Sequence, residues 1–109
     1  MMDFFNPDDR SFKEIAPGVR IRTFWGEKML LAVVNLEANA LLASHSHPHE
    51  QCSYVLEGEL EFHIAKEVRL LRPGELVVIP GGTEHFVKVG ALPAKVLDIF
   101  SPPREEFKY

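Results

Sequence analysis

The chain has 109 residues, enough for one domain and too few for two. Hydrophobic residues make up 46% and charged residues 26%, a balance typical of folded globular proteins rather than disordered ones. The formal charge is −4 and the sequence has no cluster of Lys or Arg, so nucleic acid is not expected as a partner, because phosphate binding needs basic side chains.

The first predicted strand, Val19 to Trp25, alternates along its length. One face carries Val19, Ile21 and Thr23, and the other carries Arg20, Arg22 and Phe24. Met29 to Leu36 is nearly all apolar, which predicts a strand covered on both faces. Further on, Gln51 to Leu56 leads through Glu57-Gly58 into Leu60 to Ile64, which predicts a hairpin.

Three later apolar runs and one terminal turn complete the predicted elements: Leu76 to Ile79, Phe86 to Val89, Ala94 to Phe100, and a turn near Arg104 to Phe107. Short, closely spaced strands separated by Gly and Pro predict an all-β fold, either a barrel or a two-sheet jelly roll. We expect a single domain over residues 1–109. Its parts are an N-terminal arm (1–17), the barrel (18–101) and a C-terminal tail (102–109).

The sequence also indicates the cellular compartment in which the protein is expected. Its longest apolar stretch, Met29 to Val34, is too short to cross a bilayer, and the first residues lack the basic and apolar regions of a secretory signal. The one cysteine, Cys52, cannot form an intramolecular disulfide. We therefore expect a reduced, cytoplasmic protein that has no membrane partner.

Three of the five histidines lie within five residues, at His45, His47 and His49. On a strand, His45 and His47 would share a face about 7 Å apart, close enough to bind one cation. Gln51 keeps the same parity and adds an uncharged oxygen donor. A solvated histidine-rich loop would give the same local pattern.

A second stretch favours a metal site over a solvated loop. Gly74 is followed after five residues by Pro80, then by Gly82 and His85, so a strand bounded by turns ends on one more imidazole. Neutral imidazole nitrogen binds zinc and the other first-row divalent ions.

Together the two stretches resemble the paired motifs of the cupin superfamily. The first family motif is Gly-x5-His-x-His-x3–4-Glu-x6-Gly, and this sequence reads Asn39-x5-His45-x-His47-x3-Gln51-x6-Gly58. The second is Gly-x5-Pro-x-Gly-x2-His-x3-Asn, and this sequence reads Gly74-x5-Pro80-x-Gly82-x2-His85-x3-Val89. The resemblance implies a double-stranded β-helix barrel that holds one divalent transition metal ion (Zn, Ni, Mn, Fe or Co). Its ligands would be His45, His47, Gln51 and His85.

The departure at Gln51 is informative because Glu is usual there. Three neutral imidazoles and a neutral amide leave the charge of a divalent ion uncompensated, which favours an anionic substrate. Glu50 is an alternative ligand, although its strand parity is wrong. We interpret His49 as a neighbour at the mouth of the site, and His63 as a structural or surface histidine. Cys52 is expected to be an inert, packed thiol.

A second group of candidates lies near the C-terminus. Asp98 and Phe100 share parity, so both are expected to face the barrel interior, and Arg104 follows closely. A carboxylate beside a metal site can move protons, and Arg can hold a substrate carboxylate. The alternative is a structural Asp and a tail that ties down the barrel.

A narrower resemblance bears on this group. The chain from Gly18-Val19-Arg20 to Arg104-Glu105-Glu106-Phe107 is similar to the small pectin-degradation cupins that linearise unsaturated monouronates, although the spacing from His47 to Gln51 is one residue shorter here. In that family a Gln binds the metal, and an Asp-x-Phe-x-x-x-Arg arrangement supplies site residues. The resemblance assigns these roles to Asp98, Phe100 and Arg104.

Three function hypotheses follow. The leading one is an enzyme that opens 4,5-unsaturated uronates to the 4-deoxy-5-keto sugar acid: Asp98 moves a proton, Arg104 holds the carboxylate and Phe100 walls the pocket, with Arg20 or Arg22 as further anion-binding candidates. The second is another metal-dependent enzyme, a dioxygenase or isomerase. The third is a non-catalytic module that binds or senses a small molecule.

A homodimer is also expected. The segment from Phe4-Phe5 to Phe12 is unusually aromatic for a free tail. It is predicted to cross to a partner subunit or to cap its own barrel.

Overall fold

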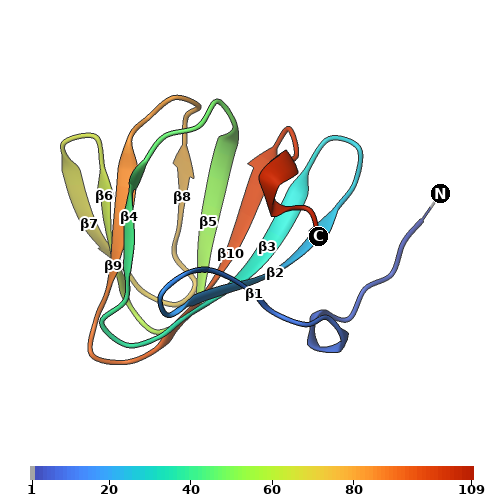
Figure 1. Cartoon of the computed structure of the whole chain (residues 1–109). Helices are drawn as coiled ribbons and strands as arrows, with labels where there is room; N and C mark the ends of the chain where they lie inside the picture. Colours follow the sequence, from blue (N-terminus) through green and yellow to red (C-terminus); the bar gives the residue numbers. More distant parts are fainter. Residues whose placement is uncertain (1) are drawn as a thin grey trace.

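Ten strands in two antiparallel sheets form the fold of residues 2–109, the part of the chain that the computed structural model describes (Figure 1). The strands are β1 (Lys13–Ala16), β2 (Val19–Trp25), β3 (Leu30–Leu36), β4 (Leu41–His45), β5 (Glu50–Glu57), β6 (Leu60–Ile64), β7 (Glu67–Leu71), β8 (Leu76–Ile79), β9 (His85–Val89) and β10 (Ala94–Ser101). Two 3₁₀ turns, η1 (Pro7–Asp9) and η2 (Glu105–Phe107), lie near the chain ends. The larger sheet has the order β1-β2-β3-β10-β5-β8, and the smaller has the order β4-β9-β6-β7. The predicted all-β jelly roll is confirmed.

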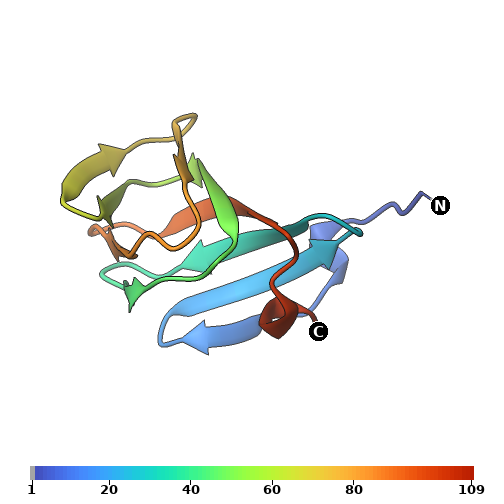
Figure 2. The same ribbon diagram turned by 90° about the horizontal axis from the view of Figure 1, so that it is seen from above.

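The core lies between the two sheets, which face each other across it (Figure 2). Every second residue of β2, β3 and β10 is buried, so the predicted alternation of Val19 to Trp25 is found in the structure. Ile21, Leu30, Val55 and Phe100 are at most 1% exposed. Burying a side chain of this size contributes about 1.5–3 kcal/mol, so this inner layer stabilises the barrel that carries the site.

The predicted hairpin between β5 and β6 is wrong. The two strands belong to different sheets: β5 pairs with β10 and β8, and β6 pairs with β7 and β9. Gly58 makes this crossing possible because it has a φ of 75°, and a Cβ there would lie 2.5 Å from the Pro93 carbonyl oxygen. The turn signal at Glu57-Gly58 therefore marks a passage from one sheet to the other.

Strand β3 departs from its prediction in one respect. Its inner residues are buried as expected, but Leu31 and Val33 on the outer face are only partly covered by the described chain. Antiparallel sheets commonly present polar side chains on such a face.

Both chain ends pack on β2 rather than remaining free. Phe5 lies against Phe24 with ring centroids 4.9 Å apart, and Phe12 lies 3.7 Å from the guanidinium carbon of Arg22. The aromatic arm thus covers its own barrel at these positions, while its first described residues extend away from the body (Figure 1). Arg20 is also under Phe12, at 4.8 Å.

The C-terminal segment 102–109, which we call the strap, also crosses β2. Thr23 Oγ1 donates to the Phe107 carbonyl oxygen at 2.6 Å. The Tyr109 hydroxyl lies 2.7 Å from the Ser11 carbonyl oxygen and 2.9 Å from that of Ile21. The expected turn near Arg104 to Phe107 is η2, which places a short helical turn within this strap.

The two ends also meet around Trp25, where Arg10 and Lys108 place their charged groups 5.8 and 5.7 Å from the indole ring. Among the described residues, no helix is long and apolar enough to span a membrane.

Candidate metal centre

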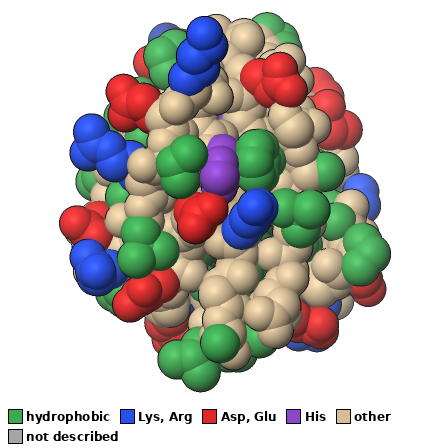
Figure 3. Space-filling view, turned by 90° about the vertical axis from the view of Figure 1, so that its left-hand side faces the viewer, with side chains coloured by type: hydrophobic (Ala, Val, Ile, Leu, Met, Phe, Trp, Pro, Cys, Tyr) green, Lys and Arg blue, Asp and Glu red, His purple; other side chains and the backbone are tan. Residues whose placement is uncertain are grey.

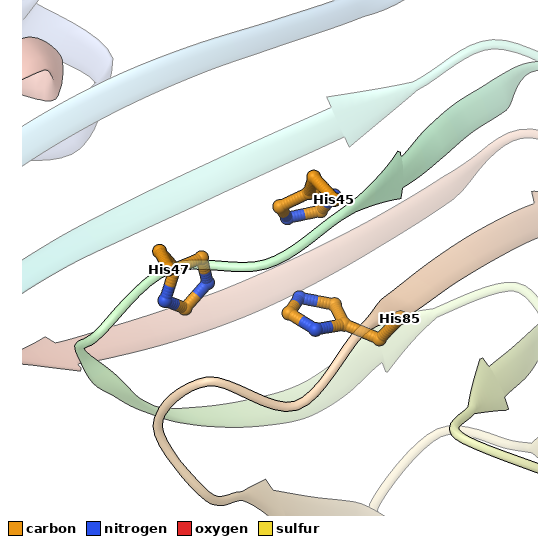
Figure 4. Close-up of side chains that lie close together, drawn as sticks. All are labelled: His45, His47 and His85. Atoms are coloured by element: carbon orange, nitrogen blue, oxygen red, sulfur yellow. The ribbon is translucent and has the colours of Figure 1, made fainter.

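Three histidines converge, two from the neighbouring strands β4 and β9 and one from the loop that follows β4 (Figure 4). His45 is the last residue of β4 and stands opposite His85, the first residue of β9, in the strand register. His47 follows in the loop between β4 and β5. One ligand atom from each ring lies within 4.8 Å of the others, so the three can share one cation.

The strand-parity argument was wrong for His47, because β4 ends at His45 and His47 lies in a loop. Instead the loop is held by the turn before β9, where the Gly82 N–H donates to the His47 carbonyl oxygen at 2.8 Å. A Cβ at Gly81 would lie 2.2 Å from the Pro48 carbonyl oxygen. The absence of a side chain at Gly81 therefore brings His47 to the other two imidazoles.

Backbone carbonyls set the orientation of all three rings. The Nδ1 atoms of His45, His47 and His85 lie 2.9, 3.0 and 2.8 Å from the carbonyl oxygens of Ala43, His49 and Thr83. Each Nδ1 is therefore the N–H donor in the neutral ring, which leaves the lone pair on Nε2. The Nε2 atom of His85 is buried and has no hydrogen-bond partner. Its lone pair is therefore free to bind a cation.

Gln51 lies beside the three histidines, and we call these four side chains the donor set. Its Oε1 lies 2.9 Å from His47 Nε2, so two lone-pair acceptors face each other once His47 Nδ1 donates to the backbone. A cation that accepts both lone pairs resolves this conflict, and the residues present therefore fit a divalent metal ion. The Gln51 amide nitrogen donates to Ser53 Oγ at 3.0 Å, which fixes which end of the amide faces the histidines.

Behind Gln51, a hydrogen-bonded chain leads to Asp98. Ser53 Oγ donates to Asp98 Oδ1 at 2.6 Å, and both side chains are buried. Desolvation by burial raises the pKa of Asp98 to about 6, although the Ser53 hydrogen bond, the Arg104 charge and Gln51 oppose that rise. An Asp in this state is poised to exchange protons near neutral pH.

Burial also sets the protonation of the histidines. Desolvation lowers the pKa of both His47 and His85 below the usual value, and the positive charges of neighbouring histidines and Arg104 act in the same direction. Both rings are thus kept neutral, which is the form that binds metal.

The other candidates near the histidine motif lie outside this donor set. Glu50 is exposed on the outward side of β5, whereas Gln51 is 6% exposed and points inward. His49 packs beside His47 with ring centroids 5.5 Å apart, and its Nδ1 is buried without a partner. Cys52 is partly exposed on the outward side of β5, and burial raises the pKa of its thiol.

His63 lies on the far side of the smaller sheet. Its ring stacks on Phe86 with centroids 4.1 Å apart, and it pairs with Glu61. This position agrees with the interpretation of His63 as a structural or surface residue.

A cavity of about 320 Å³ opens beside the histidines and collects the C-terminal candidates. Its wall includes His45, Gln51, Asp98, Phe100 and Arg104. Asp98 and Phe100 both point inward from β10, as their shared parity predicted. Most of the remaining wall is apolar.

The strap positions Arg104 at this cavity. Its guanidinium carbon lies 4.0 Å from the Phe107 ring centre and 5.0 Å from that of Phe100. Its Nε donates to Glu106 Oε1 at 3.2 Å, and the Arg104 charge lowers the pKa of Glu106 despite partial burial. By contrast, Arg20 and Arg22 lie under Phe12 on the outer face of β2 and do not line this cavity.

Sequence reasoning missed four positions that shape the site: Ser53, Thr23, Phe107 and Gly81. Ser53 shares strand parity with Gln51, a signal that could have placed it inside the barrel. The hydrogen bond from Thr23 to Phe107 joins residues 84 positions apart, and no local pattern predicts such a contact.

Residues 32–100 match the family model described as Cupin_2: Cupin domain, and the chain therefore belongs to the cupin domain family. Over 60 residues it is 33% identical to acireductone dioxygenase from Parasynechococcus marenigrum (strain WH8102), a match that covers 51% of this chain and 32% of that protein. The chain thus spans about a third of the length of this curated relative.

Two solved structures are similar over nearly the whole chain. KdgF from Halomonas sp. superposes with a TM-score of 0.93 at 26% identity, covering 99% of this chain and 100% of that one. An RmlC-like cupin from Shewanella frigidimarina NCIMB 400 gives a TM-score of 0.92 at 23% identity, covering 99% and 97%, which bears on the fold alone.

Proposed function

We propose that this cupin catalyses the metal-dependent ring opening of 4,5-unsaturated monouronates to 4-deoxy-5-keto sugar acids. The observation that carries the proposal is the cavity in which His45 and Gln51 share one wall with Asp98, Phe100 and Arg104. The similarity to KdgF from Halomonas sp. over 99% of this chain supports it, together with the resemblance of the motifs to the pectin-degradation cupins.

The donor set supports an anionic, oxygen-rich substrate. His45, His47, His85 and Gln51 would hold the ion without adding negative charge, and a divalent ion there would polarise and orient the oxygens of a bound sugar acid. Zn, Ni, Mn, Fe and Co all suit three imidazoles and an amide.

Arg104 is proposed to bind the substrate carboxylate. Its side chain is 13% exposed, and its Nε is already engaged by Glu106, which leaves the terminal guanidinium nitrogens for a ligand. The Phe100 and Phe107 rings restrict its movement and form a wall against which a sugar ring can pack.

Asp98 is proposed to move the proton. It accepts the proton of the anomeric hydroxyl as the bond between the anomeric carbon and the ring oxygen breaks, which releases the aldehyde and an enolate at C5. Return of this proton from Asp98 to C4 converts the enolate to the ketone, so the reaction is an isomerisation that consumes no co-reactant. The hydrogen bond from Ser53 holds Asp98 in place for both transfers.

The test uses purified protein loaded in turn with zinc, nickel and manganese and assayed on unsaturated galacturonate, following the loss of the substrate's ultraviolet absorbance. We expect accelerated loss in the parent and a decrease of 100-fold or more in kcat for Asp98→Asn, in line with the 10²–10⁴-fold typical of a general acid–base group. Glu84→Gln is the matched control, because Glu84 is an exposed carboxylate that bonds Ser44.

Metal content is measured separately by elemental analysis. His85→Ala should lose the metal, whereas His63→Ala should keep it, since His63 lies outside the cluster. An Asp98→Asn protein that keeps both metal and full activity would refute the proposed proton transfer. A metal-loaded parent that fails to accelerate the reaction would refute the substrate assignment.

A second candidate is a metal-dependent dioxygenase, which the partial match to acireductone dioxygenase favours. Oxygen consumption by iron- or nickel-loaded protein with an enediol substrate, abolished in His85→Ala, would support it over the uronate reaction.

A further inference from the structure

A second cavity, of about 680 Å³, lies between strands β7 and β8 and has more than twice the volume of the cavity beside the histidines. The two strands follow each other in the chain, but β7 ends the smaller sheet and β8 ends the larger one. Each strand therefore has one edge that pairs with no other described strand. We call this cavity the β7–β8 groove. Its floor is formed by four apolar side chains, Phe62, Ile64, Leu71 and Val77.

The floor of the β7–β8 groove is continuous with the core. Phe62 is 2% exposed, and the other three side chains are partly buried against the core cluster. Leu76 and Val78 extend this apolar surface on the β8 side of the groove. By contrast, the side of the molecule that carries the smaller sheet shows charged and apolar side chains interspersed (Figure 3). A concave, largely apolar site of this volume is typical of pockets that bind small molecules.

The charged side chains of the groove lie on β7 and in the turn before it. The strand register pairs Arg69 with Phe62 and Glu67 with Ile64, so both charged residues stand on the same face of the smaller sheet as the buried Phe62. Arg69 Nη2 lies 3.6 Å from Glu67 Oε2, whereas Lys66 forms no ion pair with any described residue. The wall thus carries one positive charge in excess, two against one, which favours an anion.

The positive charge and the apolar surface are separated along the groove. Lys66 precedes the first residue of β7, and Leu71 is its last residue. At about 3.4 Å per residue, β7 places roughly 14 Å between these two ends. An extended chain advances about 1.2 Å per bond, so roughly ten carbons span most of this length. The groove therefore matches a ligand with an anionic head and an unbranched apolar chain.

An extended peptide fits the groove less well than a small molecule does. Charged side chains on the inner side of an edge strand oppose the addition of a further strand, and Arg69 and Glu67 hold that position on β7. An unbranched apolar chain needs no pairing with the strand edge.

We propose that the β7–β8 groove binds a small amphiphilic carboxylate, with its apolar chain on the floor and its carboxylate at Lys66 and Arg69. This proposal does not depend on the uronate reaction. Phe62 also lines a small internal cavity beside Gln51 and Asp98, so its side chain lies between the groove and the donor set.

The test is isothermal titration of the metal-free full chain with decanoate, below the concentration at which decanoate forms micelles. The decyltrimethylammonium ion has the same chain length and the opposite charge, and we expect it to bind at least 10-fold more weakly. Octanoate should also bind 10-fold or more weakly than decanoate, because each of the two missing methylenes contributes about 4-fold when buried.

Substitution of the cationic end tests the position of the carboxylate. Lys66→Glu should weaken decanoate binding at least 10-fold, and Lys66→Glu combined with Arg69→Glu should make the ammonium ion the tighter ligand. Both residues are exposed, so the fold should persist. Lys88→Glu is the matched control, since Lys88 is an exposed cation on β9 that does not line the groove.

Arg104→Ala distinguishes the groove from the cavity beside the histidines, where Arg104 could also attract a carboxylate. Decanoate affinity should be the same in this variant as in the parent. The proposal would be overturned by a parent that binds no decanoate or binds both ions equally, by a Lys66→Glu variant that keeps the parent affinity, or by loss of binding in Arg104→Ala.

Discussion

The two sides of the candidate cavity are held in different ways. On the metal side, backbone groups orient every ring: three carbonyl oxygens accept from the Nδ1 atoms of His45, His47 and His85, and the loop rests against Gly81. On the strap side, Arg104 depends on side-chain contacts from distant parts of the chain, with Thr23 and Tyr109 anchoring the strap on β2.

This difference separates two properties that the proposed metalloenzyme would have to combine. A donor set fixed by backbone geometry tolerates little change, because a shifted loop moves a ligand atom directly. A strap held by individual side chains can be loosened in steps without disturbing the metal. Substitutions on the metal side are therefore expected to lower metal affinity, whereas substitutions on the strap side are expected to change KM or stability and leave metal affinity unchanged.

The largest effect on metal binding is expected at the metal side, for Gly81→Ala. The new Cβ would lie 2.2 Å from the Pro48 carbonyl oxygen, so the loop that carries His47 must move. We expect metal affinity to fall 10-fold or more and the free energy of unfolding to fall by about 1–3 kcal/mol. Isothermal titration with zinc measures the first and urea unfolding the second. Gly90→Ala is the control, since a Cβ at Gly90 has no atom within 4 Å, and equal losses in both would contradict the role of Gly81.

The next effect concerns pH and Asp98, which lies between the two sides. The pKa of Asp98 is raised to about 6 in the folded protein from an ordinary 3.8, so the folded state holds this proton more tightly than the unfolded state does. Its contribution to stability is complete below pH 3.8 and is lost as the pH rises through about 6, a change of about 3 kcal/mol.

Asp98→Asn removes this dependence. In metal-free protein the difference in free energy of unfolding between variant and parent should shift in favour of the variant between pH 4 and pH 7. Urea unfolding at several pH values measures it. A difference that stays constant over this range would show that Asp98 titrates with an ordinary pKa.

A smaller effect is expected on the strap side, for Thr23→Val. The substitution keeps the buried volume but removes the hydrogen bond to the Phe107 carbonyl oxygen, which costs about 1–2 kcal/mol. Because Arg104 rests on Phe107, we expect KM for the proposed uronate substrate to rise several-fold while zinc affinity stays unchanged. A loss of zinc binding in this variant would contradict the separation of the two sides.

The smallest effect is expected for Tyr109→Phe, which removes one hydroxyl that bonds Ser11 and Ile21. The ring remains beneath Arg10, 4.1 Å from its guanidinium carbon, so part of the anchor persists. We expect a loss of about 0.5–1.5 kcal/mol by thermal unfolding and a smaller change in KM than for Thr23→Val. The reverse order would identify Tyr109 as the main anchor.

The same contrast explains what the sequence could predict. Local spacing was enough for the fold class and for the convergence of His45, His47 and His85, because alternation and histidine spacing are properties of neighbouring positions. It was not enough for the path of the chain at Gly58, where the turn residues of a hairpin and of a sheet crossing are alike. Only the packing of Gly58 against Pro93 distinguishes them.

The position of the strap could not be predicted from local sequence patterns, for a related reason. Asp98 and Phe100 were placed inside by strand parity, but the distance from Arg104 to the cavity depends on contacts with β2. His47 was assigned to the cluster by a strand argument that does not hold, and its position comes from hydrogen bonding to Gly82. Contacts between residues far apart in sequence leave no periodic signal.

The meeting of the two chain ends at Trp25 has a practical consequence. Trp25 is the only tryptophan of the chain, and cationic groups of Arg10 and Lys108 flank it from the arm and the strap. Its emission should therefore serve as an intrinsic optical reporter of either terminus leaving the barrel, without any label. A purification tag fused at Tyr109 would perturb the same signal, so a tag for such work belongs at the N-terminus.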